Sequence, residues 1–214
     1  MFRPRHNNLS SVPFHNLATG VIEVTAGALG FGSDGTWDSA NFLISTAASV
    51  RLEGGTKTWT GTYTGTGPGT LTFTGGTIVA GAAGATLNFP AGFFTITNDS
   101  NINGTTFTNT GTITVNGDPN FRATINNTGT IFNDARFDFV TTGQVNNLPG
   151  GVFEITSAGD GGSFGNFSGP GFFNSGIFRH SGTGDNNLSS CRRRNKTGKV
   201  AGTKVDSGLQ SKSG

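Results

Sequence analysis

The densest group of residues that could perform chemistry is the pentapeptide Asp134-Ala135-Arg136-Phe137-Asp138. Side chains alternate between the two faces of an extended strand, so Asp134, Arg136 and Asp138 would share one face while Phe137 points the other way. Two carboxylates beside an arginine are groups that can act as general acid and general base. The pattern defines a candidate catalytic site, with a solvated row of ion pairs of little energetic value as the simpler interpretation.

Other groups that could bind or react are scattered along the chain. The three histidines have no metal-ligand spacing, and the glycine-rich runs lack the lysine and the following helix of a phosphate-binding loop. We therefore predict no metal and no cofactor. The histidines His6, His15 and His180 lie at opposite ends of the chain. Whether the acids Asp99, Asp118 and Glu154 come near the pentapeptide depends on the stacking register of the coils.

Threonine forms the most regular surface pattern. It occupies every second position from Thr56 to Thr66, and spaced pairs follow along the chain. Stacked on one flat face, such pairs would form a hydroxyl lattice of the kind that ice-binding solenoids present. The simpler interpretation is that threonine is a favoured outward residue of a β-rich rod. The pairs are Thr72/Thr74, Thr95/Thr97, Thr108/Thr110 and Thr128/Thr130.

The composition specifies the elements that must carry these residues. The 214-residue chain contains 36 glycines and 19 phenylalanines, and only 12% of its residues are charged. Strong helix formers are too scarce for a helix-rich fold. Apolar and polar residues instead alternate with period two, as in Leu71-Thr72-Phe73-Thr74, which indicates short, half-buried strands.

A repeat of about 19 residues runs through the middle of the chain. Each unit contains an apolar residue, then an asparagine, a glycine and another apolar residue, as in FTNTGTI at 107–113 and INNTGTI at 125–131. We expect the asparagines to stack at a corner, each amide bonded to the ones above and below. The last unit leaves two register marks open, Gly171 and Gly176. The marks are Gly55, Gly76, Gly92, Gly111, Gly129, Gly151 and Gly171.

Such a repeat predicts an all-β fold, a single-stranded parallel β-helix (β-solenoid) of about eight coils. Residues 34–182 would form the coils, and residues 1–33 an N-terminal cap or partial coil. Residues 183–214 are predicted to be a basic, disordered tail, with an out-of-frame reading as the alternative explanation of their composition. Uncapped ends would allow end-to-end association of solenoids.

The NxGTI and GGTI units between about 54 and 180 resemble the repeats of bacterial β-helical surface and secreted proteins. These include autotransporter passenger domains, filamentous-haemagglutinin-like adhesins and the pectin-lyase-like helices. The resemblance implies a non-catalytic, structural or adhesive segment. The alternative it implies is a β-helical carbohydrate-active enzyme using Asp134, Arg136 and Asp138, with an ice-binding threonine face as a minor alternative.

Charge and targeting signals set the expected partners. Residues 191–214 carry a net charge of +6 and residues 1–190 a net charge of −4, so the body lacks the basic surface that nucleic-acid binding requires. No apolar run is long enough to span a membrane, and no export signal precedes the repeats. We expect an extracellular or cell-surface fragment of a longer protein, whose partners are surface glycans or a host or neighbouring cell surface.

Overall fold

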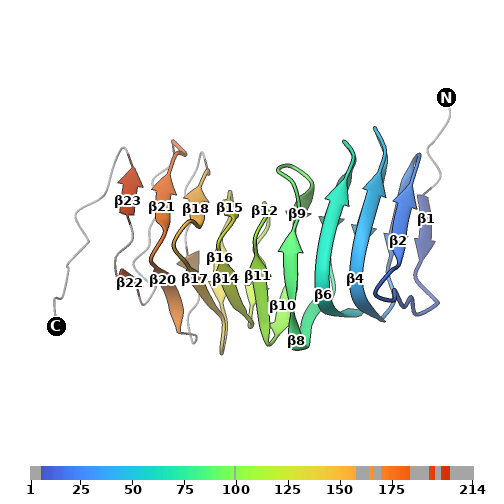
Figure 1. Cartoon of the computed structure of the whole chain (residues 1–214), viewed down its shortest axis with the longest axis horizontal. Coiled ribbons are helices and arrows are strands. Elements are labelled where there is room, and N and C mark those ends of the chain that lie inside the picture. Colours follow the sequence, from blue (N-terminus) through green and yellow to red (C-terminus); the bar gives the residue numbers. More distant parts are fainter. Residues whose placement is uncertain are drawn as a thin grey trace.

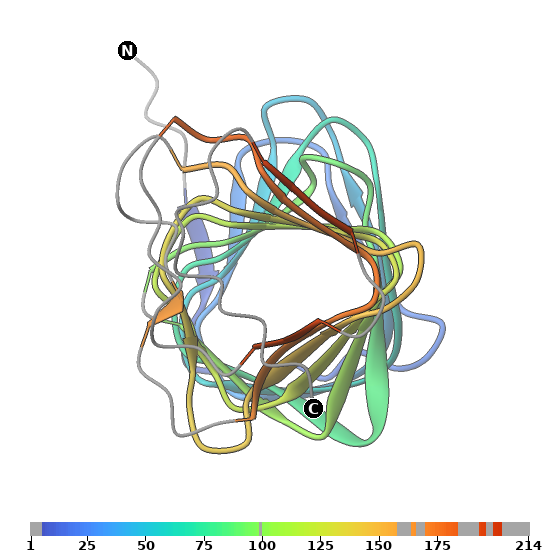
Figure 2. The same cartoon turned by 90° about the vertical axis from the view of Figure 1, so that its left-hand side faces the viewer.

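The computed structural model describes residues 6–98, 100–157, 164–165, 170–183, 193–195 and 199–202. In this part of the chain every regular element is a strand, and the strands stack in parallel as a β-solenoid of about seven turns (Figure 1). Seen along the long axis, the coils overlie one another around a closed interior (Figure 2). The predicted fold class is confirmed, with about seven turns in place of the eight expected.

One sheet runs the length of the rod and contains ten parallel strands. Their order in the sheet is β1 (His6–Leu9), β3 (Ala28–Phe31), β5 (Ser49–Leu52), β7 (Thr70–Phe73), β9 (Phe94–Ile96), β12 (Thr112–Val115), β15 (Thr130–Asn133), β18 (Val152–Ile155), β21 (Ile177–His180) and β23 (Lys199–Gly202). Strands that follow one another in this sheet come from successive passes of the chain around the solenoid.

The second sheet, of thirteen strands, is built differently at its two ends. Near the N-terminus β2 (Val21–Val24) pairs with the first of three long strands, β4 (Gly35–Ile44), β6 (Thr56–Thr66) and β8 (Thr77–Asn88). Beyond β8 the sheet divides into two rows of short strands. One row is β10 (Asn101–Gly104), β13 (Asn120–Phe121), β16 (Phe137–Phe139) and β19 (Phe164–Gly165); the other is β11 (Thr106–Asn109), β14 (Thr124–Asn127), β17 (Gln144–Asn147), β20 (Gly171–Asn174) and β22 (Arg193–Asn195).

The long strands contain left-handed backbone where their pairing slips. The register of β4 on β6 shifts at Ser39 (φ 66°), and that of β6 on β8 shifts next to Gly61 (φ 71°). Glycine adopts this conformation at no steric cost, whereas it is rare for other residues. These positions let one strand follow two sides of the coil.

Period-two alternation fills the interior with stacked apolar columns. In β12 the burial alternates so that Ile113 and Val115 are buried while Thr112 and Thr114 are half-buried on the outer face. Pairing places Ile113 directly on Ile131 of the next coil. The predicted alternation is confirmed, because parallel in-register stacking repeats the same face in every coil.

The predicted asparagine stack is also confirmed. Asn109, Asn127, Asn147 and Asn174 are at most 4% exposed, and each amide Nδ2 donates to the Oδ1 of the next at 2.7 Å. The first three Nδ2 groups also donate to a main-chain carbonyl in the following coil, at 2.9 to 3.1 Å. We call these four residues the asparagine ladder.

Glycines beside the ladder allow successive coils to approach closely. A Cβ on Gly129 would lie 2.1 Å from the carbonyl oxygen of Gly111, and one on Gly176 would lie 2.3 Å from that of Gly151. Only glycine fits such a contact. Of the two register marks that the sequence left open, Gly176 therefore continues the stack.

Coil length explains the smaller number of turns. Steps along the asparagine ladder are 18, 20 and 27 residues, while near the N-terminus Thr97 bonds to Phe73, 24 residues earlier. Strands β1 to β3 pair as coils within the stretch predicted as a cap, and β22 and β23 lie within the predicted tail. The domain boundaries at 34 and 182 remain predictions.

Candidate functional site

The predicted row of Asp134, Arg136 and Asp138 is broken by a corner. Asp134 is exposed and directly follows β15, whereas of the three only Asp138 lies in a strand, β16. The expectation that all three share one strand face is therefore wrong. Phe137 and Phe139 are fully buried in the core as expected.

Arg136 donates hydrogen bonds to two acidic side chains at this corner. Its Nη2 donates to Asp138 Oδ2 at 2.8 Å, and its main-chain N–H donates to Asp118 Oδ1 at 3.0 Å. Asp138 is 4% exposed, and its other carboxylate oxygen, Oδ1, has no hydrogen-bond partner. The buried carboxylate of Asp138 is bound by Arg136 and stabilises the corner. It is therefore poorly placed to exchange a proton with a substrate.

Glu154, another of the predicted acids, does not join this group. Glu154 belongs to β18 in the other sheet and accepts a hydrogen bond from Arg179 Nη1 at 3.1 Å. Asp99 lies outside the described residues. Among the residues that the structure describes, no three His, Cys, Asp or Glu side chains form a group that could hold a metal ion.

The threonine pairs have two different environments. The outer column Thr72, Thr95 and Thr114 is paired in register on adjacent coils. One member of each predicted pair instead uses its hydroxyl at a corner, where it donates to a main-chain carbonyl of the preceding coil. These donors are Thr74 to Leu52, Thr97 to Phe73, Thr110 to Leu87 and Thr128 to Asn109, at 3.2 to 3.4 Å.

The histidines are separated by the length of the rod, and one of them lines a surface hollow. His180 lies in β21, His6 is described by its backbone alone, and His15 precedes β2. The imidazole Nδ1 of His15 is 2.7 Å from Thr36 Oγ1, and the main-chain N–H of Thr36 lies 3.3 Å from the same nitrogen. Sequence reasoning missed this pair because its members are 21 residues apart on successive coils.

The hollow beside His15 has a volume of about 390 Å³. Its floor is the outer face of β4 and β6, where Thr36 and Thr58 are paired in register. Asp34 stands at one side and accepts a hydrogen bond from the main-chain N–H of Thr56 at 2.7 Å. The lining residues are Pro13, His15, Asp34, Gly35, Thr36, Thr56 and Thr58.

A buried amine lies close to this hollow without lining it. Lys57 is 1% exposed, and its Nζ donates to the carbonyl oxygen of Gly54. Burial disfavours the charged form and lowers the pKa of Lys57 to about 8, while the carboxylates of Asp34 and Glu53 act in the opposite direction.

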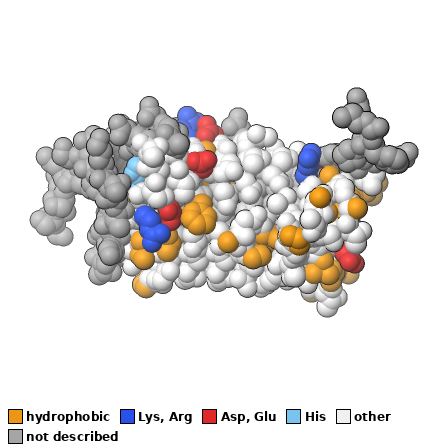
Figure 3. Space-filling model, turned by 90° about the horizontal axis from the view of Figure 1, so that it is seen from above, with side chains coloured by type: hydrophobic (Ala, Val, Ile, Leu, Met, Phe, Trp, Pro, Cys, Tyr) orange, Lys and Arg blue, Asp and Glu red, His pale blue; other side chains and the backbone are white. Residues whose placement is uncertain are grey.

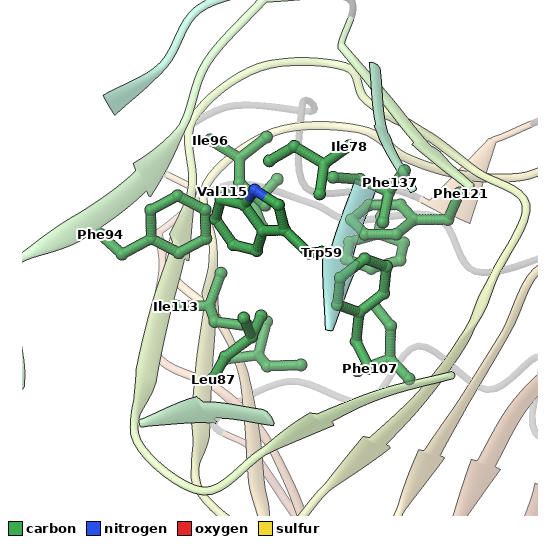
Figure 4. A pocket seen from close by; sticks show the side chains of 13 residues that line it. Trp59, Ile78, Leu87, Phe94, Ile96, Phe107, Ile113, Val115, Phe121 and Phe137 are labelled. Carbon is green, nitrogen blue, oxygen red and sulfur yellow. The ribbon is translucent and has the colours of Figure 1, made fainter. Parts of the chain in front are cut away.

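The enclosed cavity on the axis is a packing gap. Its volume is about 20 Å³, and aromatic and aliphatic side chains surround it, among them Trp59, Phe94 and Ile113 (Figure 4). The indole nitrogen of Trp59 is buried without a hydrogen-bond partner. The space is too small for anything larger than a water molecule, and a buried water needs at least two polar partners. The apolar lining does not supply them, so this space is not a ligand site.

One face of the rod carries few charged side chains. On the face seen in Figure 3, uncharged side chains and backbone cover most of the area, and charged groups appear only in small clusters. No helix in the described part of the chain is both long and apolar enough to cross a membrane.

Fold and surface together define this chain as a parallel β-solenoid repeat protein. Comparison with models of protein families, with curated proteins and with solved structures gives no match in any of the three. The functional argument therefore depends on the residues described above.

Proposed function

We propose that the chain is a structural and adhesive segment of a secreted or cell-surface bacterial protein, and that it is not an enzyme. The observation that carries this proposal is the outward display of uncharged polar groups in rows along a stiff core. The asparagine ladder and the apolar columns fix the coils, so the outer hydroxyls and amides repeat at the strand spacing of about 4.8 Å. Repeated weak contacts along such a face give binding through avidity.

The runner-up function is a carbohydrate-active enzyme that uses Asp134 and Asp138. The arrangement supports it less well, because Asp138 is buried against Arg136 while Asp134 is exposed on the far side of a corner. Acid–base catalysis at a glycosidic bond requires two carboxyl groups that both face the substrate.

One experiment separates the two functions. Beads coated with the whole chain are tested for saturable attachment to bacterial and host cells, and the same protein is assayed for turnover of a panel of polysaccharides. We expect attachment without turnover. Turnover that is lost in both Asp134→Ala and Asp138→Ala would overturn the proposal in favour of the enzyme.

End-to-end association of copies is a further part of the proposal. Strands β1 and β2 each pair with one neighbour, β3 and β4 respectively. Four large apolar side chains of the described residues are exposed, all in the same region: Leu9, Val12, Leu17 and Val21. Unpaired edges and apolar surface favour contact with a second copy. Sedimentation velocity over a range of concentrations checks this, with a larger species expected at high concentration.

A further inference from the structure

We infer that the hollow lined by His15, Asp34, Thr36 and Thr58 binds one neutral sugar unit. This inference rests on the proposed adhesive function and gives it a particular site. The hollow is shallow and open to solvent, with a volume of about 390 Å³, so it would hold one sugar ring against its floor without enclosing it.

The hydrogen bonds around His15 fix which groups it offers. The main-chain N–H of Thr36 can only donate, so Nδ1 of His15 is an acceptor and carries no proton. The Thr36 hydroxyl, 2.7 Å from the same nitrogen, must then donate to it. The imidazole proton is therefore on Nε2, which forms no hydrogen bond with the described residues and is available as a donor. The Thr36 oxygen keeps its lone pairs as acceptors.

The opposite side of the hollow supplies complementary groups. Asp34 uses Oδ1 to hold the main-chain N–H of Thr56, which leaves Oδ2 as an acceptor. The hydroxyl of Thr58 makes no hydrogen bond to the described residues and can both donate and accept. Pro13 adds an apolar surface. Closely spaced donors and acceptors beside an apolar patch match the vicinal hydroxyls and the C–H face of a pyranose ring.

The charge of the lining residues determines whether the hollow favours neutral or acidic sugars. The lining contains one carboxylate, Asp34, and no lysine or arginine, because the buried amine of Lys57 is bonded to Gly54 and does not line the hollow. A uronate placed here would put a second negative charge near Asp34, and the only nearby amine among the described residues, that of Lys57, is buried and bonded to Gly54, so it cannot contact the ligand. The site is thus expected to accept neutral hexoses and to reject acidic ones.

The test is a titration of the whole chain, followed by NMR, with methyl glycosides of glucose, mannose and galactose and with glucuronate. We expect at least one neutral glycoside to bind in the millimolar range and glucuronate not to bind. Thr58→Val keeps the branched shape but removes the hydroxyl, and His15→Ala removes the donor. Each should weaken binding about three- to tenfold.

Two further variants complete the design. Asp34→Asn keeps an acceptor for the Thr56 N–H while removing the charge, so it should retain the neutral glycoside and gain binding of glucuronate. Thr108→Val is the matched control, because Thr108 is a half-buried outward threonine on β11, outside the hollow. It should bind as the wild type does.

Two results would overturn the inference: no neutral glycoside binds to the wild type, or Thr58→Val and His15→Ala bind like the Thr108→Val control. Attachment of coated beads to cells is measured in parallel with the same proteins. If cells are bound but no glycoside is, the hollow is wrong and the adhesive function stands. If glycosides bind but cells do not, the adhesive function fails and the site stands.

Discussion

The two halves of the rod fill the same interior column with different chemistry. On the N-terminal side the column holds Ala40, Tyr63 and Leu87, and from the next coil onward it holds the asparagine ladder. Tyr63 stacks on Trp59 with ring centroids 4.1 Å apart, and its hydroxyl donates to the carbonyl oxygen of Trp37. The backbone stacking is alike in both halves, so it does not depend on one kind of side chain.

The comparison shows what the apolar column and the asparagine ladder each require of the neighbouring coils. Aromatic side chains fill a wide coil and need little hydrogen bonding, whereas a buried amide is stabilising only when its partners recur in every coil. At the boundary this requirement fails, because Leu87 offers no donor and Asn109 Oδ1 is left without a partner. The predictions below test this difference between the halves.

The largest effect is expected from Asn127→Leu. The change leaves the amides of Asn109 and Asn147 each without one ladder partner and frees the carbonyl of Val152. We expect the free energy of unfolding to fall by about 3 kcal/mol. Urea denaturation measures this. Asn126→Ala is the control, since Asn126 lies half-buried on the outer face and should cost under about 1 kcal/mol; equal losses in the two variants would contradict the role of the ladder.

The buried amine of the N-terminal half predicts a dependence on pH. Because the pKa of Lys57 is lowered to about 8 in the folded state, the unfolded chain binds more protons between that value and the ordinary 10.5. Stability should therefore rise as the pH increases from 7 to 10, by about 2 kcal/mol. Denaturation curves at each pH check this, and Lys57→Met should remove the rise. A pH profile in Lys57→Met that is identical to the wild type would refute the assignment.

An amide outside the ladder should destabilise the C-terminal half. Asn133 occupies an inward position between Val115 and Ile155, is fully buried, and both its amide nitrogen and its amide oxygen lack partners. Asn133→Leu has a similar shape and no polar atoms, so we expect a gain of about 1.5 kcal/mol in the free energy of unfolding. Thermal melting is a sufficient measurement. A loss of stability would mean that Asn133 has a partner after all.

The smallest expected effect on the free energy of unfolding concerns the boundary between Leu87 and the asparagine ladder. In Leu87→Asn the new amide can donate to Asn109 Oδ1, whereas the same change at Leu71, in the other sheet, meets no ladder. Both variants lose apolar burial, but we expect Leu87→Asn to cost about 1 kcal/mol less than Leu71→Asn. Comparing the two urea midpoints decides this, and equal costs would show that the ladder cannot be extended.

Local periodicity made the fold predictable. The alternation around Ile113 and the repeated asparagines specify inward positions without any knowledge of neighbouring coils, and both predictions are confirmed. The expectation that Asp134, Arg136 and Asp138 share one strand face was wrong, because residues 134–136 form a corner between β15 and β16 and nothing in an alternating pattern marks where the strand stops. The contact between His15 and Thr36 could not be predicted from the sequence for another reason. It depends on the register of one coil on the next, which packing determines.

The ladder also has a mechanical consequence in the structural role that we propose. Its hydrogen bonds run from coil to coil along the rod, so a pull on the two ends loads one coil junction after another and peels the rod stepwise. Each junction from Asn109 to Asn174 is crossed by an amide hydrogen bond of this inward column. The Tyr63 hydroxyl likewise reaches back to Trp37 of the preceding coil, whereas Leu87 makes no side-chain hydrogen bond to either neighbouring coil. Under tension the two junctions beside Leu87, which no side-chain hydrogen bond of the inward column crosses, should therefore give way before those of the ladder.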